Sequence, residues 1–349
     1  MSNGTVSRND KTLVAEFEHR WNKKRTDFPD GFDFLLYYKN IEQYFNTNVH
    51  PNVNQGAVLN GDGVLTDHGV KHVEMVMNRA YMIISKRIEN ISGFELFILL
   101  VAIHLHDVGN IYGRNDHEKQ IMDVMLKYLE QHKMDMPLVK EIVKIAMAHS
   151  GDYKGSKDTI YLILEKESSI LGKQIRPRLI GSLLRFADEI SEDKTRATIF
   201  LLDSGELPKG NEIYHHYSMA LDPISYIGST LIFNYHLLPD DTKRKFGKME
   251  NNDVKRMYLY DEILIRMVKT LKELEYCRLY SWGFIDIDSI SIKIDITKNE
   301  ELAPVFEDNI RLHLQGYPLK RGVRIEDLVE KPLKVPNGIK LKSTILGGK

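Results

Sequence analysis

Histidine and aspartate residues recur through the middle of the sequence where helical segments begin or end. They are His72, His106, Asp107, His117, His149 and Asp188, with His68 one helical turn before the first. Imidazole and carboxylate ligands without thiolates suit Mn, Fe, Co, Ni or Zn, and carboxylate-rich sites also take Mg. The single cysteine, Cys277, has no thiol neighbour with which to build a Cys-type zinc site. Any metal must therefore be held by His, Asp and Glu.

Two of the aspartates follow apolar helical sequence. Residues 96–103 carry no charge and lead directly to His106 and Asp107, while Asp188 comes one turn after Leu184. Burying an unpaired carboxylate is costly, so each aspartate needs a cation, and a metal ion is the simplest one. For Asp188 a salt bridge to Arg185, three residues earlier, is the alternative.

These residues occur in the order of a known signature. His72, the pair His106-Asp107 and then Asp188 resemble the H…HD…D pattern of the HD-domain metal-dependent phosphohydrolase superfamily, over roughly residues 60–200. The resemblance implies an HD-type helical bundle in which these four side chains converge on a divalent metal.

A second ion is implied by two further histidines. His117 and His149 resemble the additional ligands of those family members that bind two metals. Asp107 would then bridge the two ions, so the resemblance implies one or two ions per chain.

The first ligand is either His68 or His72, which the helical spacing predicts on one face. Val76, a small apolar residue four positions after His72, favours His72. His68 is then expected to contact phosphate or donate a proton in catalysis. The alternative for His68 is a residue hydrogen-bonded to a turn at the start of the helix.

Hydrolysis also requires cations that neutralise charge on the substrate. The candidates are Lys71, Arg114, Lys119 and Lys154. Arg114 ranks first because a guanidinium binds phosphate through two parallel hydrogen bonds. We therefore assign catalytic roles to Asp107, His68 and Arg114; for each cation, a solvated surface position is the alternative.

Departures from known branches narrow the substrate. Ser150-Gly151 after His149 lacks the motifs of cyclic-di-GMP phosphodiesterases, and the residues after Asp107 lack the acids of alarmone hydrolases. Asn110 stands where deoxynucleotide triphosphohydrolases commonly have His, which leaves that activity open through His117. The runs 66–69 and 113–118 resemble a less characterised HD branch found in nucleotide signalling and defence.

Three functions compete. The leading one is a metal-dependent phosphohydrolase of a small nucleotide, either a (deoxy)nucleoside phosphate or a cyclic or oligonucleotide signal. The others are a nucleotide-sensing regulator whose metal does not turn over substrate, and an HD-type nuclease. The near-neutral net charge of −1 gives no basic track for nucleic acid. The longest apolar run, Leu96–Ile103, is too short to cross a bilayer, which needs about 20 residues. We expect a cytoplasmic protein without a membrane partner.

The periodicity predicts a mainly α protein with a smaller α+β region at its C-terminal end. We expect three segments: N-terminal helices and a loop over 1–60, the HD-type domain over 61–200, and an accessory region with a basic tail over 201–349. The accessory region shapes the substrate pocket, an effector site or a homo-oligomer interface. The predicted helices cover 68–90, 93–106, 117–132, 137–149, 177–190 and 254–275, and strands are predicted near 230–235 and 290–296.

Residues 46–64 are rich in Asn and Gly and contain one Pro. This composition favours turns, so we predict a long loop. Loops of this length inside domains are often functional, and this one precedes the His cluster, which makes it a candidate lid over the substrate.

Overall fold

The computed structural model describes residues 12–59, 66–113, 117–150, 152–250, 253–297, 304–319 and 322–347. The chain folds into two compact units. The first contains residues 1–60, 69–188 and 280–285, and the second contains residues 61–68, 189–279 and 286–349. The division into three segments at residues 60 and 200 stays a prediction.

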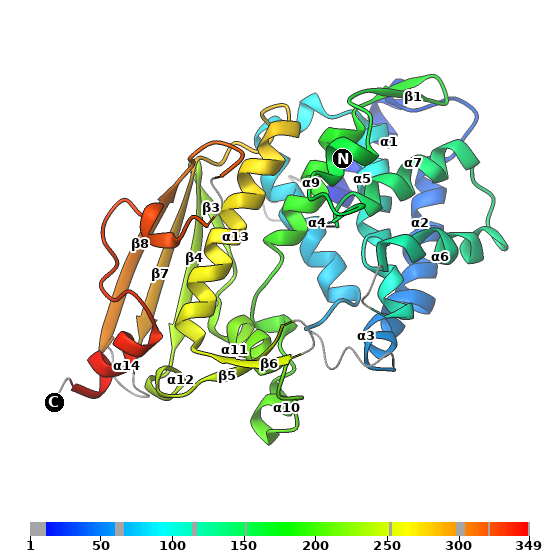
Figure 1. Cartoon of the computed structure of the whole chain (residues 1–349). Coiled ribbons are helices and arrows are strands. Elements are labelled where there is room, and N and C mark those ends of the chain that lie inside the picture. Colours follow the sequence, from blue (N-terminus) through cyan, green and yellow to red (C-terminus); the bar gives the residue numbers. More distant parts are fainter. Residues whose placement is uncertain are drawn as a thin grey trace, which may run out of the picture. The chain divides into compact units, whose positions relative to one another are not determined.

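The first unit is built from helices (Figure 1). They are α1 (Leu13–Lys23), α2 (Phe34–Tyr44), α3 (His50–Leu59), α4 (Val70–Ile84), α5 (Gly93–Leu105), α6 (Ile121–Leu129), α7 (Met136–Met147), α8 (Thr159–Ile163) and α9 (Pro177–Glu189). Short 3₁₀ segments η4 (Val108–Tyr112) and η5 (His117–Gln120) follow α5, and β1 (Ser168–Ile170) pairs with β2 (Lys173–Ile175). The predicted helices of this region are therefore present, with small shifts at their ends.

Helix α5 is the centre of the first unit. Every residue from Gly93 to Leu105 is buried, and a capping box between Ser92 and Glu95 closes its N-terminus. The segment Gly93–Tyr112 is long and apolar enough to cross a membrane, but 94% of it is buried within the protein. A helix that is apolar all round and covered by its neighbours is a core helix.

The N-terminal helices pack on α5 through aromatic side chains. The ring of Phe17 in α1 lies 6.0 Å from that of Phe97 in α5, and Phe34 in α2 lies 4.9 Å from the same ring. The Phe34–Phe97 pair is edge-to-face, an arrangement that contributes packing energy beyond simple burial. Aromatic side chains of α1 and α2 therefore contact α5.

The predicted long loop over 46–64 is wrong for the residues that the structure describes. A π-helical turn covers Phe45–Val49, and α3 continues to Leu59; residues 60–64 lie outside the described part. Two asparagines bond to the backbone four residues earlier, Asn48 to the Tyr44 carbonyl and Asn52 to the Asn48 carbonyl. Tertiary packing overrides local propensity here, because Gly56 lets α3 approach the backbone of Ile111 closely. The described part of this segment supports η4, which follows Asp107.

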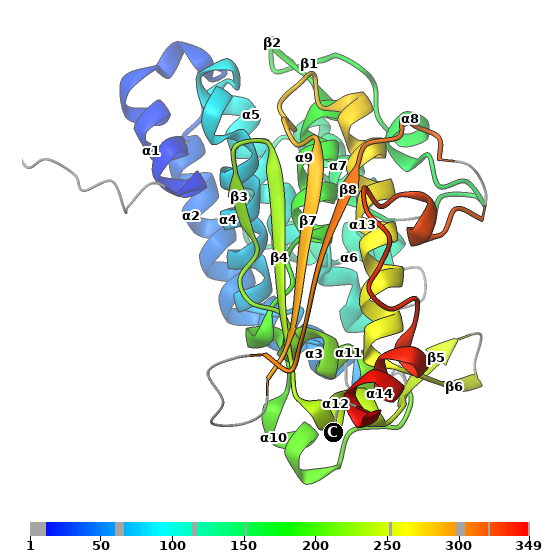
Figure 2. The same ribbon diagram turned by 90° about the vertical axis from the view of Figure 1, so that its left-hand side faces the viewer.

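The second unit contains the sheet, in strand order β3-β4-β7-β8. Its strands are β3 (Ser225–Ile227), β4 (Thr230–Leu237), β7 (Ser289–Ile296) and β8 (Phe306–His313), and Figure 2 shows them side by side. β4 and β7 are parallel and the other pairs are antiparallel. The strands predicted near 230–235 and 290–296 are confirmed.

The remaining elements of the second unit are mostly helical. They are α10 (Ile199–Ser204), α11 (Glu212–Ala220), α12 (Pro239–Lys243), α13 (Leu259–Tyr280), α14 (Gly338–Gly347) and a hairpin of β5 (Phe246–Glu250) and β6 (Asp253–Met257). The start of the predicted helix 254–275 is wrong, because residues 253–257 form β6. This segment is extended because it pairs with β5, and the hydrophobic pattern of the segment alone gives no sign of that pairing. The mainly α class with a smaller strand-containing C-terminal region is confirmed.

The close approach of α3 to η4 yields a stability prediction. A Cβ added at Gly56 would lie 2.3 Å from the Ile111 carbonyl oxygen, so Gly56→Ala must displace backbone. We expect Gly56→Ala to lower the free energy of unfolding by about 2 kcal/mol or more, as overpacking does. Thermal unfolding measures it, and Gln55→Ala, at an exposed position of the same helix, is the control. Equal melting temperatures for the two variants would contradict the packing of α3.

Candidate metal centre

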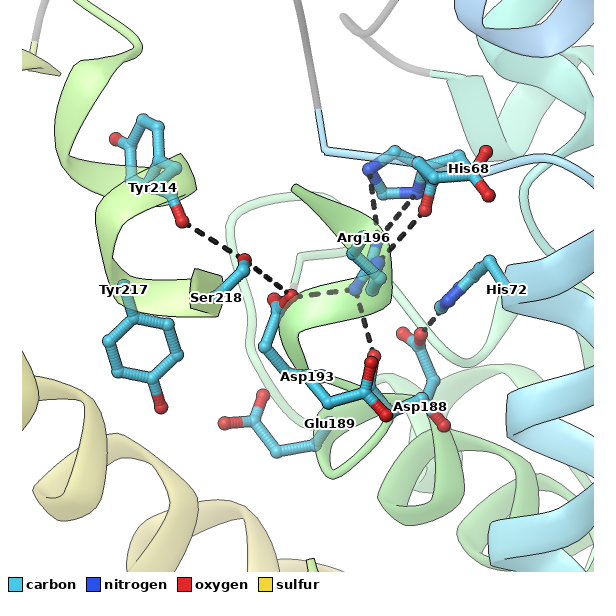
Figure 3. A network of polar contacts seen from close by, with 12 residues as sticks. His68, His72, Asp188, Glu189, Asp193, Arg196, Tyr214, Tyr217 and Ser218 are labelled. Carbon is cyan, nitrogen blue, oxygen red and sulfur yellow. Dashed lines mark hydrogen bonds and ion pairs between the residues drawn. The ribbon is translucent and has the colours of Figure 1, made fainter. Parts of the chain in front are cut away.

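The ends and faces of three helices bring the first group of ligands together. His72 lies on the buried face of α4, His106 caps the C-terminus of α5, and Asp188 lies in the last turn of α9. The Nε2 atom of His72 is 3.2 Å from the Nε2 of His106 and 3.2 Å from the Oδ1 of Asp188. Figure 3 shows His72 directed at Asp188. Residues far apart in the sequence thus form one cluster.

Asp107 joins this first group to a second one. Its Oδ2 lies 3.5 Å from the Nε2 of His72 and 3.3 Å from the Nε2 of His106. Its Oδ1 lies 3.6 Å from the Nε2 of His117 and 3.8 Å from the Nε2 of His149. One carboxylate therefore presents one oxygen to each pair of imidazoles.

The donor atoms fit a divalent ion in each group. The ligand atoms of His72, His106 and Asp188 lie within 4.8 Å of one another, and so do those of Asp107, His117 and His149. All of them are imidazole nitrogens or carboxylate oxygens, the donors preferred by Mn, Fe, Co, Ni and Zn. These groups contain every residue that the sequence predicts as a metal ligand.

Backbone acceptors orient two of the imidazoles. The Nδ1 of His106 is 2.7 Å from the Ile103 carbonyl, and the Nδ1 of His149 is 2.5 Å from the Ala146 carbonyl. A carbonyl only accepts, so Nδ1 carries the proton in both rings and Nε2 faces the cluster. This hydrogen-bond pattern is typical of metal-binding histidines.

The electrostatics of the first group require positive charge. Burial lowers the pKa of His106, but Asp107 and Asp188 outweigh it and leave that pKa raised well above its usual value. Burial raises the pKa of Asp188, but hydrogen bonds from His106 and His72 outweigh it and leave that pKa well below its usual value. Two imidazole Nε2 atoms 3.2 Å apart also repel unless a proton or a metal ion lies between them. A divalent ion meets both requirements.

His149 is in the form that binds metals. Burial, and then the charge of His106, lower the pKa of His149 to about 4. The ring is therefore neutral near pH 7, with its Nε2 lone pair free of a proton.

Two structural features place His117. A Cβ on Gly109 would lie 1.8 Å from the His117 carbonyl oxygen, so only glycine allows η4 and η5 to approach this closely. On the ring's other side, Nδ1 lies 3.6 Å from the Oε2 of Glu118. The glycine after the HD pair thus positions a second-group ligand.

His68 is placed differently from His72. The prediction that both lie on one helical face is wrong, because α4 begins at Val70 and its N-cap, Gly69, is extended. His68 belongs to the second unit, where both ring nitrogens lie 3.3–3.4 Å from the Nη2 of Arg196 (Figure 3). Arg196 also donates through Nε to the Asp67 carbonyl at 2.8 Å, which holds this segment outside the helix. A catalytic role for His68 stays a prediction.

The predicted phosphate contacts differ in their surroundings. Lys71, Lys119 and Lys154 are exposed, and Lys154 also lies over the ring of Tyr153, 5.2 Å from its centroid. Arg114 lies outside the described residues. The substrate roles of these four residues stay predictions.

Arg185 and Thr159 make contacts that sequence reasoning did not anticipate. The Nη1 of Arg185 donates to the Ser150 carbonyl at 3.0 Å and to the Oγ1 of Thr159 at 2.8 Å, next to His149. Asp188 pairs with His72 and His106 instead of depending on Arg185. No spacing rule connects Thr159 with Arg185, because their contact depends on the tertiary fold.

Comparison with known proteins agrees with this centre. The HD-CE family model matches residues 63–237, half of the chain and all of the ligand residues, so the chain belongs to the HD-CE family. This membership shows an HD-type domain, as the sequence predicts. No curated protein and no solved structure matches the chain.

Metal content tests the two ligand groups separately. Asp107→Asn removes the charge that both groups share, so we expect it to lose most of the bound metal. His117→Ala removes a ligand of the second group alone and should lower the metal content by one ion per chain. Elemental analysis of purified protein after incubation with Mn²⁺ or Zn²⁺ measures both effects.

The control is His19→Ala, an exposed histidine of the first unit, which should leave the metal content unchanged. Equal metal in the wild type and in Asp107→Asn would rule out the centre described here.

Proposed function

We propose that the protein is a metal-dependent phosphohydrolase that acts on a small nucleotide through a two-ion centre. The observation that carries this proposal is the carboxylate of Asp107, whose two oxygens face two separate pairs of imidazoles. A bridging carboxylate between two ions is the arrangement of hydrolases that stabilise both the attacking and the leaving oxygen of a phosphoryl transfer. Membership of the HD-CE family supports the same class of chemistry.

Each ligand group would hold one ion. His72, His106, Asp107 and Asp188 would hold one ion, and Asp107 with His117 and His149 would hold the other. When bound, such ions lower the pKa of coordinated water and offset charge that develops on phosphoryl oxygens. The protein orients its imidazoles. Hydrogen bonds to the Ile103 and Ala146 carbonyls fix the rings of His106 and His149, whose Nε2 atoms face the cluster.

Side-chain exposure indicates where substrate enters. The side chains of His72 and His106 are fully buried, whereas those of Asp188 and His117 are 29% and 18% exposed. Substrate then reaches the centre on the side of Asp188 and His117. In the sequence, Arg114 precedes His117 by three residues and Lys119 follows it by two, and we propose both as phosphate contacts.

A small nucleotide is favoured over a polymer. Positive and negative charges nearly cancel, with 48 Lys and Arg against 49 Asp and Glu, whereas polymer-binding proteins need a basic track that follows the phosphate backbone. The two phosphate contacts that we propose, Arg114 and Lys119, would suit a few phosphates next to the metal centre.

A panel of nucleotides tests this function. Nucleoside mono-, di- and triphosphates, their deoxy forms, and cyclic and short linear oligonucleotides are incubated with the protein and Mn²⁺ or Mg²⁺, and products are separated by chromatography. We expect hydrolysis of at least one small nucleotide. Asp107→Asn should lower that rate by about 100-fold or more, because it removes metal ions whose stabilisation of transition-state charge is worth several kcal/mol.

The other outcomes identify the alternatives. Tight nucleotide binding without turnover would replace the hydrolase with a sensing regulator. Cleavage of long single strands that weakens steeply with salt would replace it with a nuclease. His19→Ala serves again as the control that should keep wild-type rates.

A further inference from the structure

The turn that carries His149 is held by two buried residues from other parts of the first unit. Helix α7 ends at Met147, so His149 lies just beyond the regular helix. The carbonyls of Ala148 and Ser150 flank it. The Oγ1 of Thr159 lies 2.8 Å from the Ala148 carbonyl and 3.0 Å from the Ser150 carbonyl. One hydroxyl group therefore contacts the backbone on both sides of the ligand.

Arg185 completes this arrangement. Its Nη1 donates to Oγ1 of Thr159 and to the Ser150 carbonyl. The hydroxyl of Thr159 has one proton, which it can direct at the carbonyls while its lone pair accepts from the guanidinium. The charge of Arg185 thus fixes the direction in which the Thr159 hydroxyl donates.

Burial raises the free-energy cost of breaking these hydrogen bonds. Thr159 is fully buried and Arg185 is 5% exposed. The bond from Thr159 to the Ala148 carbonyl and the bond between Arg185 and Thr159 are buried, whereas the two bonds to the Ser150 carbonyl are part-buried. In such surroundings an unmade hydrogen bond costs the full desolvation of the group. The turn at His149 is therefore expected to have one conformation while Thr159 and Arg185 are present.

Helix α9 connects this arrangement to the first ligand group. Arg185 lies three residues before Asp188, so the two side chains leave neighbouring positions on one helix. Asp188 contacts His72 and His106, and Arg185 contacts the turn of His149. One rigid element therefore sets both groups.

We propose that Arg185 and Thr159 are positioning residues that hold His149 ready for the second ion. This inference rests on the proposed two-ion function. Neither residue touches the ligand ring itself in the hydrogen bonds described here. They act through the backbone of residues 148–150, and His149 in turn donates from Nδ1 to the Ala146 carbonyl.

The test compares Thr159→Val with Thr159→Ser. Valine keeps the shape and removes the hydroxyl, whereas serine keeps the hydroxyl. We expect Thr159→Val to weaken binding of the second Mn²⁺ or Zn²⁺ by about 10- to 100-fold, the usual effect of losing an outer-shell contact, and to leave the first ion in place. Thr159→Ser should restore wild-type affinity. Titration calorimetry with elemental analysis gives both numbers.

A second measurement needs no metal. In the metal-free wild type, nitrogen-15 NMR of labelled histidines should show His149 as the single tautomer with its proton on Nδ1. In Thr159→Val we expect a mixture of tautomers, because the Ala146 carbonyl and the ring are no longer held in register. Ser182→Ala is the control. It also removes a buried hydroxyl, but this hydroxyl donates to the Leu179 carbonyl within α9.

The outcomes separate this inference from the proposed function. A wild type that binds one ion would end the two-ion function, and the His149 spectrum would then decide on the positioning role alone. Wild-type affinity and an unchanged spectrum in Thr159→Val would overturn the positioning role. If Thr159→Val does not fold, Arg185→Lys, which keeps the charge and loses the planar fork, is subject to the same two measurements.

Discussion

The buried carboxylate of Asp107 is the constraint on which the centre depends. It lies among the imidazoles of His72, His106, His117 and His149, each with its Nε2 within 3.8 Å of one of its oxygens. A charge in this position is stable only when cations or hydrogen-bond donors surround it. The fold meets this demand by converging helix ends from three parts of the chain on one point. Because the same carboxylate and imidazole groups can also ligate a metal, the cluster could hold a divalent ion.

Helix α5 makes this convergence possible. All of its side chains are buried, so its C-terminus lies inside the first unit. His106 and Asp107, which follow it directly, therefore lie there too. Helix α3 and η4 then fix the chain that follows. Gly56 allows α3 to reach Ile111, and Gly109 allows η4 to reach the backbone of His117. The contacts Gly56–Ile111 and Gly109–His117 thus fix the chain between α5 and His117, which belongs to the second group.

The sequence predicted which His and Asp side chains come together, but not the residues that support them, for a physical reason. His72, His106, Asp107 and Asp188 stand in a characteristic order, and the structure brings them together with His117 and His149. Helical periodicity also located α5 and α9, because an apolar pattern is a local property. Thr159 and Arg185 are 26 residues apart and meet only in the folded chain.

The errors in the prediction have the same origin. The Asn- and Gly-rich composition of 46–59 favours turns locally, yet α3 forms, with Gly56 packed against the backbone of Ile111 in η4. His68 has helical spacing to His72, yet Arg196 holds the Asp67 backbone outside the helix. In each case a contact with a distant segment decided the local structure.

The borders between the two units fall beside α4 and α9, the helices that carry His72 and Asp188. The chain enters the first unit between His68 and Gly69, directly before α4, and leaves it after Asp188, within the last turn of α9. Inside the second unit, Arg196 binds the Asp67 carbonyl before one border and the Ser191 carbonyl after the other. Arg196 is 7% exposed; its bond to the Ser191 carbonyl is buried and its bond to the Asp67 carbonyl is part-buried. The segments that lead into His72 and out of Asp188 are therefore tied to each other by one buried side chain.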